Sequence, residues 1–163
     1  MTKLRASDGA LLGTFPAGTT PSYAAYDGAN IWVSNYAVDT VTKLRASDGA
    51  LLGTFPVGSL PNGILFDGVN IWVANYGDNT VSKLKASDGT VLGTFPVGDR
   101  PYGIAFDLWV TDYSSADAMK LRRATGTVQK VYPTGDSPEG VLFDGTSIWI
   151  ANSVSDTVTE ISP

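Results

Sequence analysis

The sequence predicts an all-β fold, a β-propeller of four-stranded antiparallel blades with about 40 residues per blade. Three observations support it. The segment Thr2–Pro16 recurs letter for letter as Thr42–Pro56 and, with conservative changes, as Ser82–Pro96. No window shows the apolar spacing of a helix. A tryptophan among β-branched residues returns at a spacing of about 40 residues, at Trp32, Trp72, Trp109 and Trp149.

The unit from Pro61 to Pro96 shows how one blade is composed. Asp67-Gly68 and Ser87-Asp88-Gly89 are strong turn signals, and Tyr76–Asn79 is a polar loop. Proline cannot donate to a ladder, so Pro96 and Pro101 should bracket the crossing to the next unit. The segments between these signals are rich in β-branched and aromatic residues. The predicted strands are Ile64–Phe66, Ile71–Asn75, Thr80–Lys85 and Val91–Phe95.

Four blade-equivalents fill a single domain, residues 1–163. Three units are whole, at residues 21–56, 61–96 and 101–133. The fourth is composite, because residues 138–161 lack a fourth strand and residues 1–16 supply one. Completing the last blade with N-terminal strands is how propellers avoid an open edge. Thr2–Arg5 and Val158–Ile161 are both third-strand copies, so we expect one of them to lie outside the sheet.

The third unit lacks the turn residues between its first two strands. Phe106-Asp107 runs directly into Leu108-Trp109, whereas the second unit has Asp67-Gly68-Val69-Asn70 at this place. Two antiparallel strands need a loop between them. Either the hairpin is deformed or the chain is interrupted between Asp107 and Leu108, and we favour the interruption.

These residues resemble a known repeat. The string Asn75…Thr80-Val81-Ser82, followed by Pro96-Val97-Gly98 and Pro101–Phe106, resembles the YVTN/NHL-type propeller repeat of YncE-like and virginiamycin-lyase-like proteins. The resemblance covers essentially the whole chain. It implies a fold and does not specify an activity, because propellers host many unrelated functions. The similar lyases depend on histidines, and this chain has none, so that activity is not carried over.

Composition excludes several classes of function. The net charge is −5 and there is no basic stripe, which argues against nucleic-acid binding. The chain has neither cysteine nor histidine, which removes disulfides, catalytic triads and the usual zinc ligands. We therefore expect no cofactor, no metal and no catalytic residue. There is no signal peptide and no apolar run of membrane-spanning length, so we expect a soluble chain of undetermined location.

Several repeated residues are interpreted as structural. The four tryptophans should pack between blades, and the Asp-Gly pairs should form turns. The residues that end the second strands should bond to loop backbone; they are Asn35, Asn75, Asp112 and Asn152. Such a ring could hold calcium, but only one of the four is charged.

A ligand-binding face is predicted where the repeats diverge, on the loops at one side of the disc. The tyrosines would offer flat platforms, and Asn62, Arg100 and Glu139 would orient a polar ligand. Glu139 is also the candidate for acid–base chemistry, with Asp99, Asp112 or Asp136 as its partner. The predicted ligand-binding residues are Ser22, Tyr36, Asn62, Tyr76, Arg100, Tyr102, Tyr113 and Glu139.

Three functions are compatible with these features. The favoured one is a non-catalytic binding or scaffold propeller whose loop face meets a small molecule, glycan or protein. The first alternative is a purely structural assembly, produced by recent blade amplification. The second alternative is a carboxylate-based hydrolase or lyase in the central funnel. We expect a homodimer that forms one eight-bladed ring, with a compact four-bladed monomer as the alternative, and no nucleic-acid or membrane partner.

Overall fold

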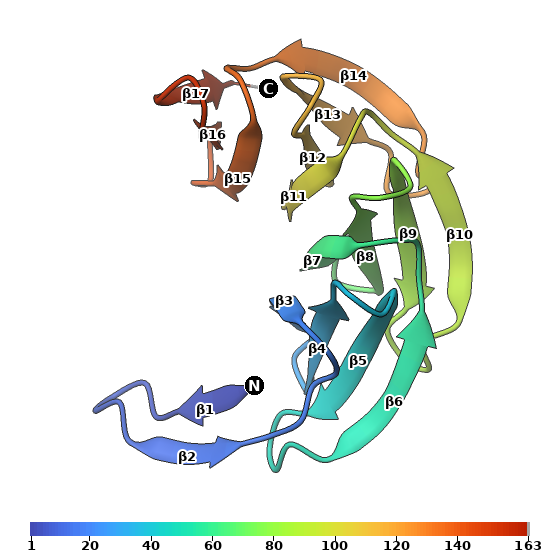
Figure 1. Ribbon diagram of the computed structural model, residues 1–163, viewed down its shortest axis with the longest axis vertical. Coiled ribbons are helices and arrows are strands. Elements are labelled where there is room, and N and C mark those ends of the chain that lie inside the picture. Colours follow the sequence, from blue (N-terminus) through green and yellow to red (C-terminus); the bar gives the residue numbers. More distant parts are fainter. Residues whose placement is uncertain (163) are drawn as a thin grey trace.

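The computed structural model describes residues 1–162, which form an open arc of five antiparallel sheets radiating from one axis (Figure 1). Three sheets have four strands each, and the sheets at the two ends have two and three strands. This confirms the predicted all-β propeller of four-stranded blades. Within these residues, no helix is long and apolar enough to span a membrane.

The strands follow one another along the chain in blade order. The N-terminal sheet holds β1 (Thr2–Leu4) and β2 (Leu11–Thr14). The first whole blade holds β3 (Pro21–Tyr26), β4 (Asn30–Asn35), β5 (Thr40–Arg45) and β6 (Leu51–Pro56). The second holds β7 (Pro61–Phe66), β8 (Asn70–Asn75), β9 (Thr80–Lys85) and β10 (Val91–Pro96). The third holds β11 (Pro101–Ala105), β12 (Trp109–Asp112), β13 (Asp117–Leu121) and β14 (Val128–Pro133). The C-terminal sheet holds β15 (Pro138–Phe143), β16 (Ile148–Asn152) and β17 (Thr157–Ile161).

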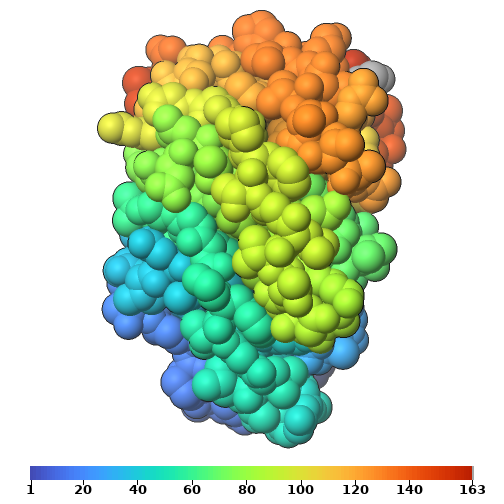
Figure 2. All heavy atoms as spheres, turned by 90° about the vertical axis from the view of Figure 1, so that its right-hand side faces the viewer, coloured from blue at the N-terminus to red at the C-terminus, as the bar shows by residue number. Residues whose placement is uncertain are grey.

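The prolines lie inside the strand ends instead of outside them. Pro61 opens β7, the strand nearest the axis, and Pro96 closes β10 at the rim. Both strands are edges of their sheets, where a residue without an N–H group is tolerated. Figure 2 looks onto the rim, over which the outermost strands β6, β10 and β14 run one above another.

The chain is continuous through the third hairpin, so the predicted interruption between Asp107 and Leu108 is wrong. Both residues have positive φ, 59° and 61°, and with Phe106 they form a three-residue loop between the paired residues Ala105 and Trp109. The Leu108 N–H donates to the Ala105 carbonyl at 3.1 Å. Leu108 is fully buried, so the short turn also supplies an apolar side chain to the core.

The core consists of layers between neighbouring blades, each centred on a tryptophan. Trp32 packs against Ile64, Ile71 and Val73 of the next blade. Trp72 packs against Leu108 and Val110, and Trp109 packs against Ile148 and Ile150. The predicted inter-blade role is thus confirmed for three of the four.

Trp149 is the exception among the tryptophans. It is 38% exposed, whereas Trp32, Trp72 and Trp109 are exposed by 1% or less. The predicted burial is wrong for this residue, because no blade follows the sheet β15–β17 in the described chain. Leu142 and Val158 of the same sheet are exposed with it.

The two ends of the arc do not join within residues 1–162. Strands β1–β2 form one sheet and β15–β17 another, and Figure 1 shows them on opposite sides of an opening. The ends are complementary in strand content, so completion of the last blade by N-terminal strands is consistent with the structure. The compact four-bladed monomer is not formed. Both third-strand copies are ordered strands, so neither is displaced in the single chain.

Each innermost strand contains a bulge close to its start. The register of β7 with β8 shifts between Pro61 and Ile64, and that of β11 with β12 shifts between Pro101 and Ile104. The intervening residues therefore leave the ladder. A Cβ on Gly103 would lie 2.2 Å from the Glu139 carbonyl oxygen. Glycine at this place lets the strands β11 and β15 approach closely.

We expect Gly103→Ala to destabilise the fold by about 1–3 kcal/mol, because the new methyl group meets backbone that cannot rotate away. Urea denaturation of the two proteins measures this difference. Ser22→Ala is the control, since Ser22 lies at the bulge of β3 and is exposed. Equal free energies of unfolding for Gly103→Ala and the parent chain would contradict the close approach.

Candidate functional site

The bulges bring most of the predicted ligand-binding residues together. A cavity of about 300 Å³ lies on the face of the disc where the innermost strands begin. Each innermost strand contributes its second residue, which lies in the bulge, and the three whole blades contribute the tyrosine that follows the second strand. The lining residues are Ser22, Tyr36, Asn62, Tyr76, Tyr102, Tyr113 and Glu139. Seven of the eight predicted residues thus share one cavity.

Four tyrosine rings form a continuous cluster in this cavity. The centroid of Tyr76 lies 6.4 Å from that of Tyr36, 6.2 Å from that of Tyr102 and 6.3 Å from that of Tyr113. The rings of Tyr102 and Tyr113 are 6.0 Å apart. These are tilted or edge-on contacts, the arrangement that aromatic quadrupoles favour.

The eighth predicted residue, Arg100, does not line the cavity. Its guanidinium carbon lies 5.7 Å from the centroid of Tyr76, so it contacts the tyrosine cluster through a cation–π interaction. Arg100 also has positive φ, 58°, as do Thr20, Leu60 and Ser137 at the same place in the other units. Each of these residues immediately precedes the first proline of a blade.

Glu139 is the carboxylate of the cavity, and its position is fixed locally. The Ser153 hydroxyl donates to Glu139 Oε1 at 3.0 Å and stands within 3.1 Å of the Ser137 carbonyl oxygen. Ser153 occupies the place that tyrosine has in the other units. Among residues 1–162, no three Asp, Glu, His or Cys side chains gather closely enough to hold a metal ion.

The innermost strands are held in place by hydroxyl groups that sequence reasoning did not single out. The amide of Tyr23 donates to Ser34 Oγ at 3.1 Å, and Ser34 Oγ donates to the Asn62 carbonyl at 2.6 Å. Thr111 Oγ1 joins the Gly103 amide to the Glu139 carbonyl in the same way, at 2.9 and 3.0 Å. Each hydroxyl satisfies a backbone group that a bulge leaves outside the ladder. Ser34 and Thr111 each lie two residues after a tryptophan, and this shared position is the sequence feature that could have identified them.

The residues that end the second strands have partners different from those predicted. The Asn35 amide nitrogen donates to Thr40 Oγ1 at 3.2 Å and to Thr42 Oγ1 at 2.9 Å. Asn75 and Asn152 make the same pair of bonds in their own blades. The predicted bonds from these amides to loop backbone are therefore wrong. The third strand supplies hydroxyls at the right spacing, and those hydroxyls accept the amide protons.

In the third blade, Asp112 replaces the asparagine, and the third strand lacks the two hydroxyl residues. Asp117 and Met119 replace the two hydroxyl residues of the third strand. Asp112 is fully buried, and neither of its carboxylate oxygens has a hydrogen-bond donor. Burial, followed by the nearby charge of Asp117 and then that of Asp99, raises the pKa of Asp112 to about 9. The pKa of Asp117 is raised as well, chiefly by burial.

This pKa makes stability depend on pH in one direction. The pKa of Asp112 is about 9 in the folded chain, whereas an unfolded aspartate has a pKa of about 3.9. Above pH 4 the unfolded state releases a proton that the folded state keeps, so stability falls as the pH rises from about 4 to 9. Below the pKa that Asp112 has in the unfolded chain, both states hold the proton, and no stability is lost.

We expect Asp112→Asn to stabilise the chain at pH 7.5 by about 1–3 kcal/mol, because it removes a buried carboxylate without a donor. The new amide can donate to Asp117 Oδ1, which has no partner. Urea denaturation at several pH values between 4.5 and 8.5 measures the effect, with Asp136→Asn, an exposed aspartate of the next unit, as the control. A fall in stability with pH that is the same in Asp112→Asn and the parent would show that Asp112 is ionised.

The comparisons agree with the architecture. No model of a protein family matches the sequence, and no curated protein does. Among solved structures, a virginiamycin B lyase from Staphylococcus aureus matches 99% of this chain with a TM-score of 0.82 and 20% identity. A functionally unknown protein from Desulfotomaculum acetoxidans matches 99% with a TM-score of 0.81 and 18% identity, and U3-55K matches 99% with a TM-score of 0.85 and 13% identity.

These similarities define a β-propeller of the kind that virginiamycin B lyase has. At such identities they show the fold alone, and the predicted resemblance is confirmed at that level. The chain spans 58% of the lyase, 60% of the Desulfotomaculum protein and 54% of U3-55K. It is therefore similar to a little over half of each of these propellers.

Proposed function

We propose that this chain is a binding module, half of a propeller whose loop face receives a small polar molecule, a glycan or an exposed part of a protein. The cavity lined by four tyrosines and Glu139 carries this proposal. Its residues come from four successive blades, so the cavity exists only when the blades are packed. Binding sites are commonly built in this way, from loops and strand ends on a rigid scaffold.

The chemistry of the lining favours a ligand with a flat or cationic surface. Tyrosine faces stack against sugar rings and attract positive charge through their quadrupoles. Glu139 adds a negative charge, and Asn62 and Ser22 add hydrogen-bonding groups. Because the lining holds a single carboxylate, it supports binding better than the two-carboxylate chemistry of a hydrolase.

The same proposal includes self-association of two copies into one eight-bladed ring. The exposed face of β15–β17 carries Trp149, whose three counterparts are buried by a following blade. The other end of the arc has Ile31, Val33 and Leu44, the counterparts of the residues that bury those tryptophans. Each end thus offers what the other lacks. The purely structural alternative would share this assembly and have no ligand.

We expect choline and maltotriose, as cationic and neutral probes, to bind the loop face with affinities that Tyr102→Ala reduces about tenfold. The lost aromatic contact is worth about 1–2 kcal/mol. Glu139→Gln should weaken binding of choline only. Isothermal titration calorimetry measures both, with the exposed Val69→Ala as the control. The proposed site would be contradicted if neither probe bound, or if both substitutions left the affinities unchanged.

We expect light scattering to give a mass near twice 17.1 kDa for the parent chain. Trp149→Ala should weaken the association at least a hundredfold, because removal of a buried tryptophan costs about 3–5 kcal/mol. Leu52→Ala at the rim is the control. A mass of one chain at every concentration would exclude the pair and leave the ligand site to be tested separately.

A further inference from the structure

Two strands are available for one place in the blade that a pair of chains would share. The edge of β16 needs one third strand, and the chain has two copies of that strand, β17 and β1. In one chain β17 pairs with β16, and β1 pairs with β2 at the far end. The residues that face the following blade distinguish the two copies.

In the first two whole blades, a basic residue of the third strand connects two blades. Lys43 Nζ donates to the carbonyls of Ala86 and Ser87 in the next blade, at 2.7 and 3.1 Å. The same ammonium group lies 4.9 Å from the centroid of the Trp32 ring in its own blade. Lys83 repeats the arrangement, with a bond of 2.8 Å to the Arg123 carbonyl and a distance of 4.7 Å to Trp72.

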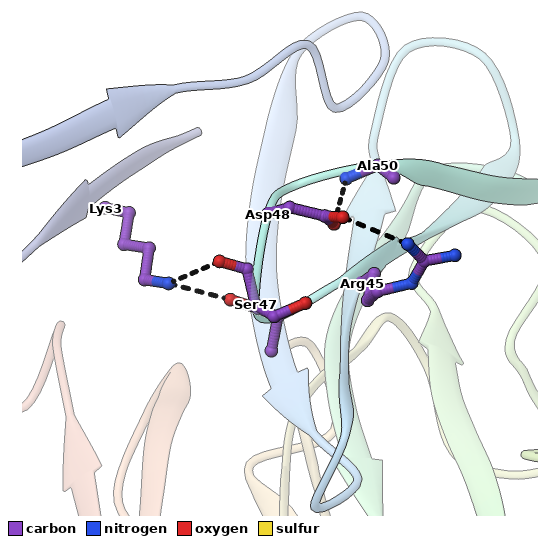
Figure 3. A network of polar contacts seen from close by, with 6 residues as sticks. Lys3, Arg45, Ser47, Asp48 and Ala50 are labelled. Atoms are coloured by element: carbon purple, nitrogen blue, oxygen red, sulfur yellow. Dashed lines mark hydrogen bonds and ion pairs between the residues drawn. The ribbon is translucent and has the colours of Figure 1, made fainter.

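Strand β1 has the residue that this position requires. Lys3 Nζ donates to the carbonyls of Ala46 and Ser47 at 2.9 and 3.1 Å, as Figure 3 shows for the turn that follows β5. Lys3 therefore makes the inter-blade contact of Lys43 from an incomplete blade. What it lacks is a tryptophan beneath it, because β1–β2 has no second strand.

Strand β17 has the opposite charge at this position. Glu160 lies directly across from Trp149, in the register in which Lys43 lies across from Trp32. A carboxylate cannot donate to the carbonyls of the following blade, and it would be desolvated against them. Strand β16 therefore has the tryptophan and strand β1 has the lysine, at opposite ends of the chain.

A cavity lies at the N-terminal end, where the missing tryptophan would pack. It has a volume of about 380 Å³ and is lined by Met1, Lys3, Phe15, Ile31 and Leu44, among others. Phe15 occupies the place of Phe55, whose ring lies 5.6 Å from that of Trp32. The cavity is therefore bounded by the same residue types that surround each buried tryptophan.

We propose that, in the pair on which the proposed function rests, β16 of one copy pairs with β1 of the second copy and releases its own β17. Trp149 then enters the cavity beside Phe15 of the second copy, beneath Lys3. The repeat register places Trp149 across from Lys3 and Ile150 across from Thr2. The shared blade consists of β15 and β16 from one chain and β1 and β2 from the other.

Residues of β1 take over the main contacts that β17 makes with its neighbours. Leu4 of β1, which is 56% exposed in the single chain, takes the place of Ile161 against the preceding blade. Thr2 takes the place of Thr159 as an acceptor for Asn152. The bond from Asn152 to Thr157 is lost. Strand β17 gives up the burial of Ile161, whereas its Val158 is already 63% exposed.

Engineered cysteines test which strand occupies the place, because the chain has no cysteine of its own. The double variant Ile150→Cys/Thr2→Cys should form a disulfide between two chains on mild oxidation. The double variant Thr159→Cys/Thr14→Cys should form none, because it reports β17 pairing with β2 of the second copy. Cross-linking of the second variant, or of neither while the parent is a pair, would overturn the exchange.

Charge variants provide a second measurement. Lys3→Glu should weaken association of the pair at least tenfold, and Glu160→Lys should not strengthen it. If β17 stayed in the ring, Glu160→Lys would tighten the pair and Lys3→Glu would leave it unchanged. Hydrogen exchange of the unmodified chain should show residues 157–161 losing protection on pairing; retained protection would overturn the exchange. A single-chain mass for the parent would instead mean that the proposed pairing itself fails.

Discussion

In each whole blade, the tryptophan of the second strand holds the structure together, because it is the point at which that blade contacts the next. Its indole N–H donates to an aspartate in the preceding turn, at 2.8 Å for Trp32 and 2.7 Å for Trp72. A lysine ammonium covers one side of the ring. Apolar residues of the following blade cover the rest. The ring is thereby fixed by a hydrogen bond, a charge and a packed surface at once.

The loop face follows from this packing. With the blades fixed at their centres, the innermost strands approach closely enough that Gly103 has no room for a side chain. The bulges then turn Asn62, Tyr102 and Glu139 toward the axis, outside the ladders. A residue outside the ladder can change without loss of strand pairing. This explains how these positions can differ from unit to unit while the strand pairing of the blades is kept.

Much of the fold could be predicted because the repeat is visible in the sequence. The eight predicted ligand-binding residues could be assigned to one face because each has a fixed position within the repeat. The predictions that failed have three separate causes. Trp149 stands at the repeat position of a core residue, but no blade covers it within residues 1–162. The hairpin at Asp107–Leu108 closes with positive φ at two residues for which no glycine signals it. The partners of Asn35 lie on the neighbouring strand of its own blade, and the register that brings them together is not visible in the sequence.

The two ends of the arc are different surfaces, and this has a geometric consequence. A contact between unlike surfaces of identical molecules is heterologous, or head-to-tail. Each copy that is added therefore leaves one free end of each kind. Such a contact closes only when the angle spanned by one chain divides a full turn. A substitution that changes the angle between two blades would keep the strength of the contact between copies and change the angle at which the copies meet. The product would then be a larger ring or a filament. In the proposed pair, the angle between blades, to which the close approach at Gly103 contributes, would therefore govern the size of the particle.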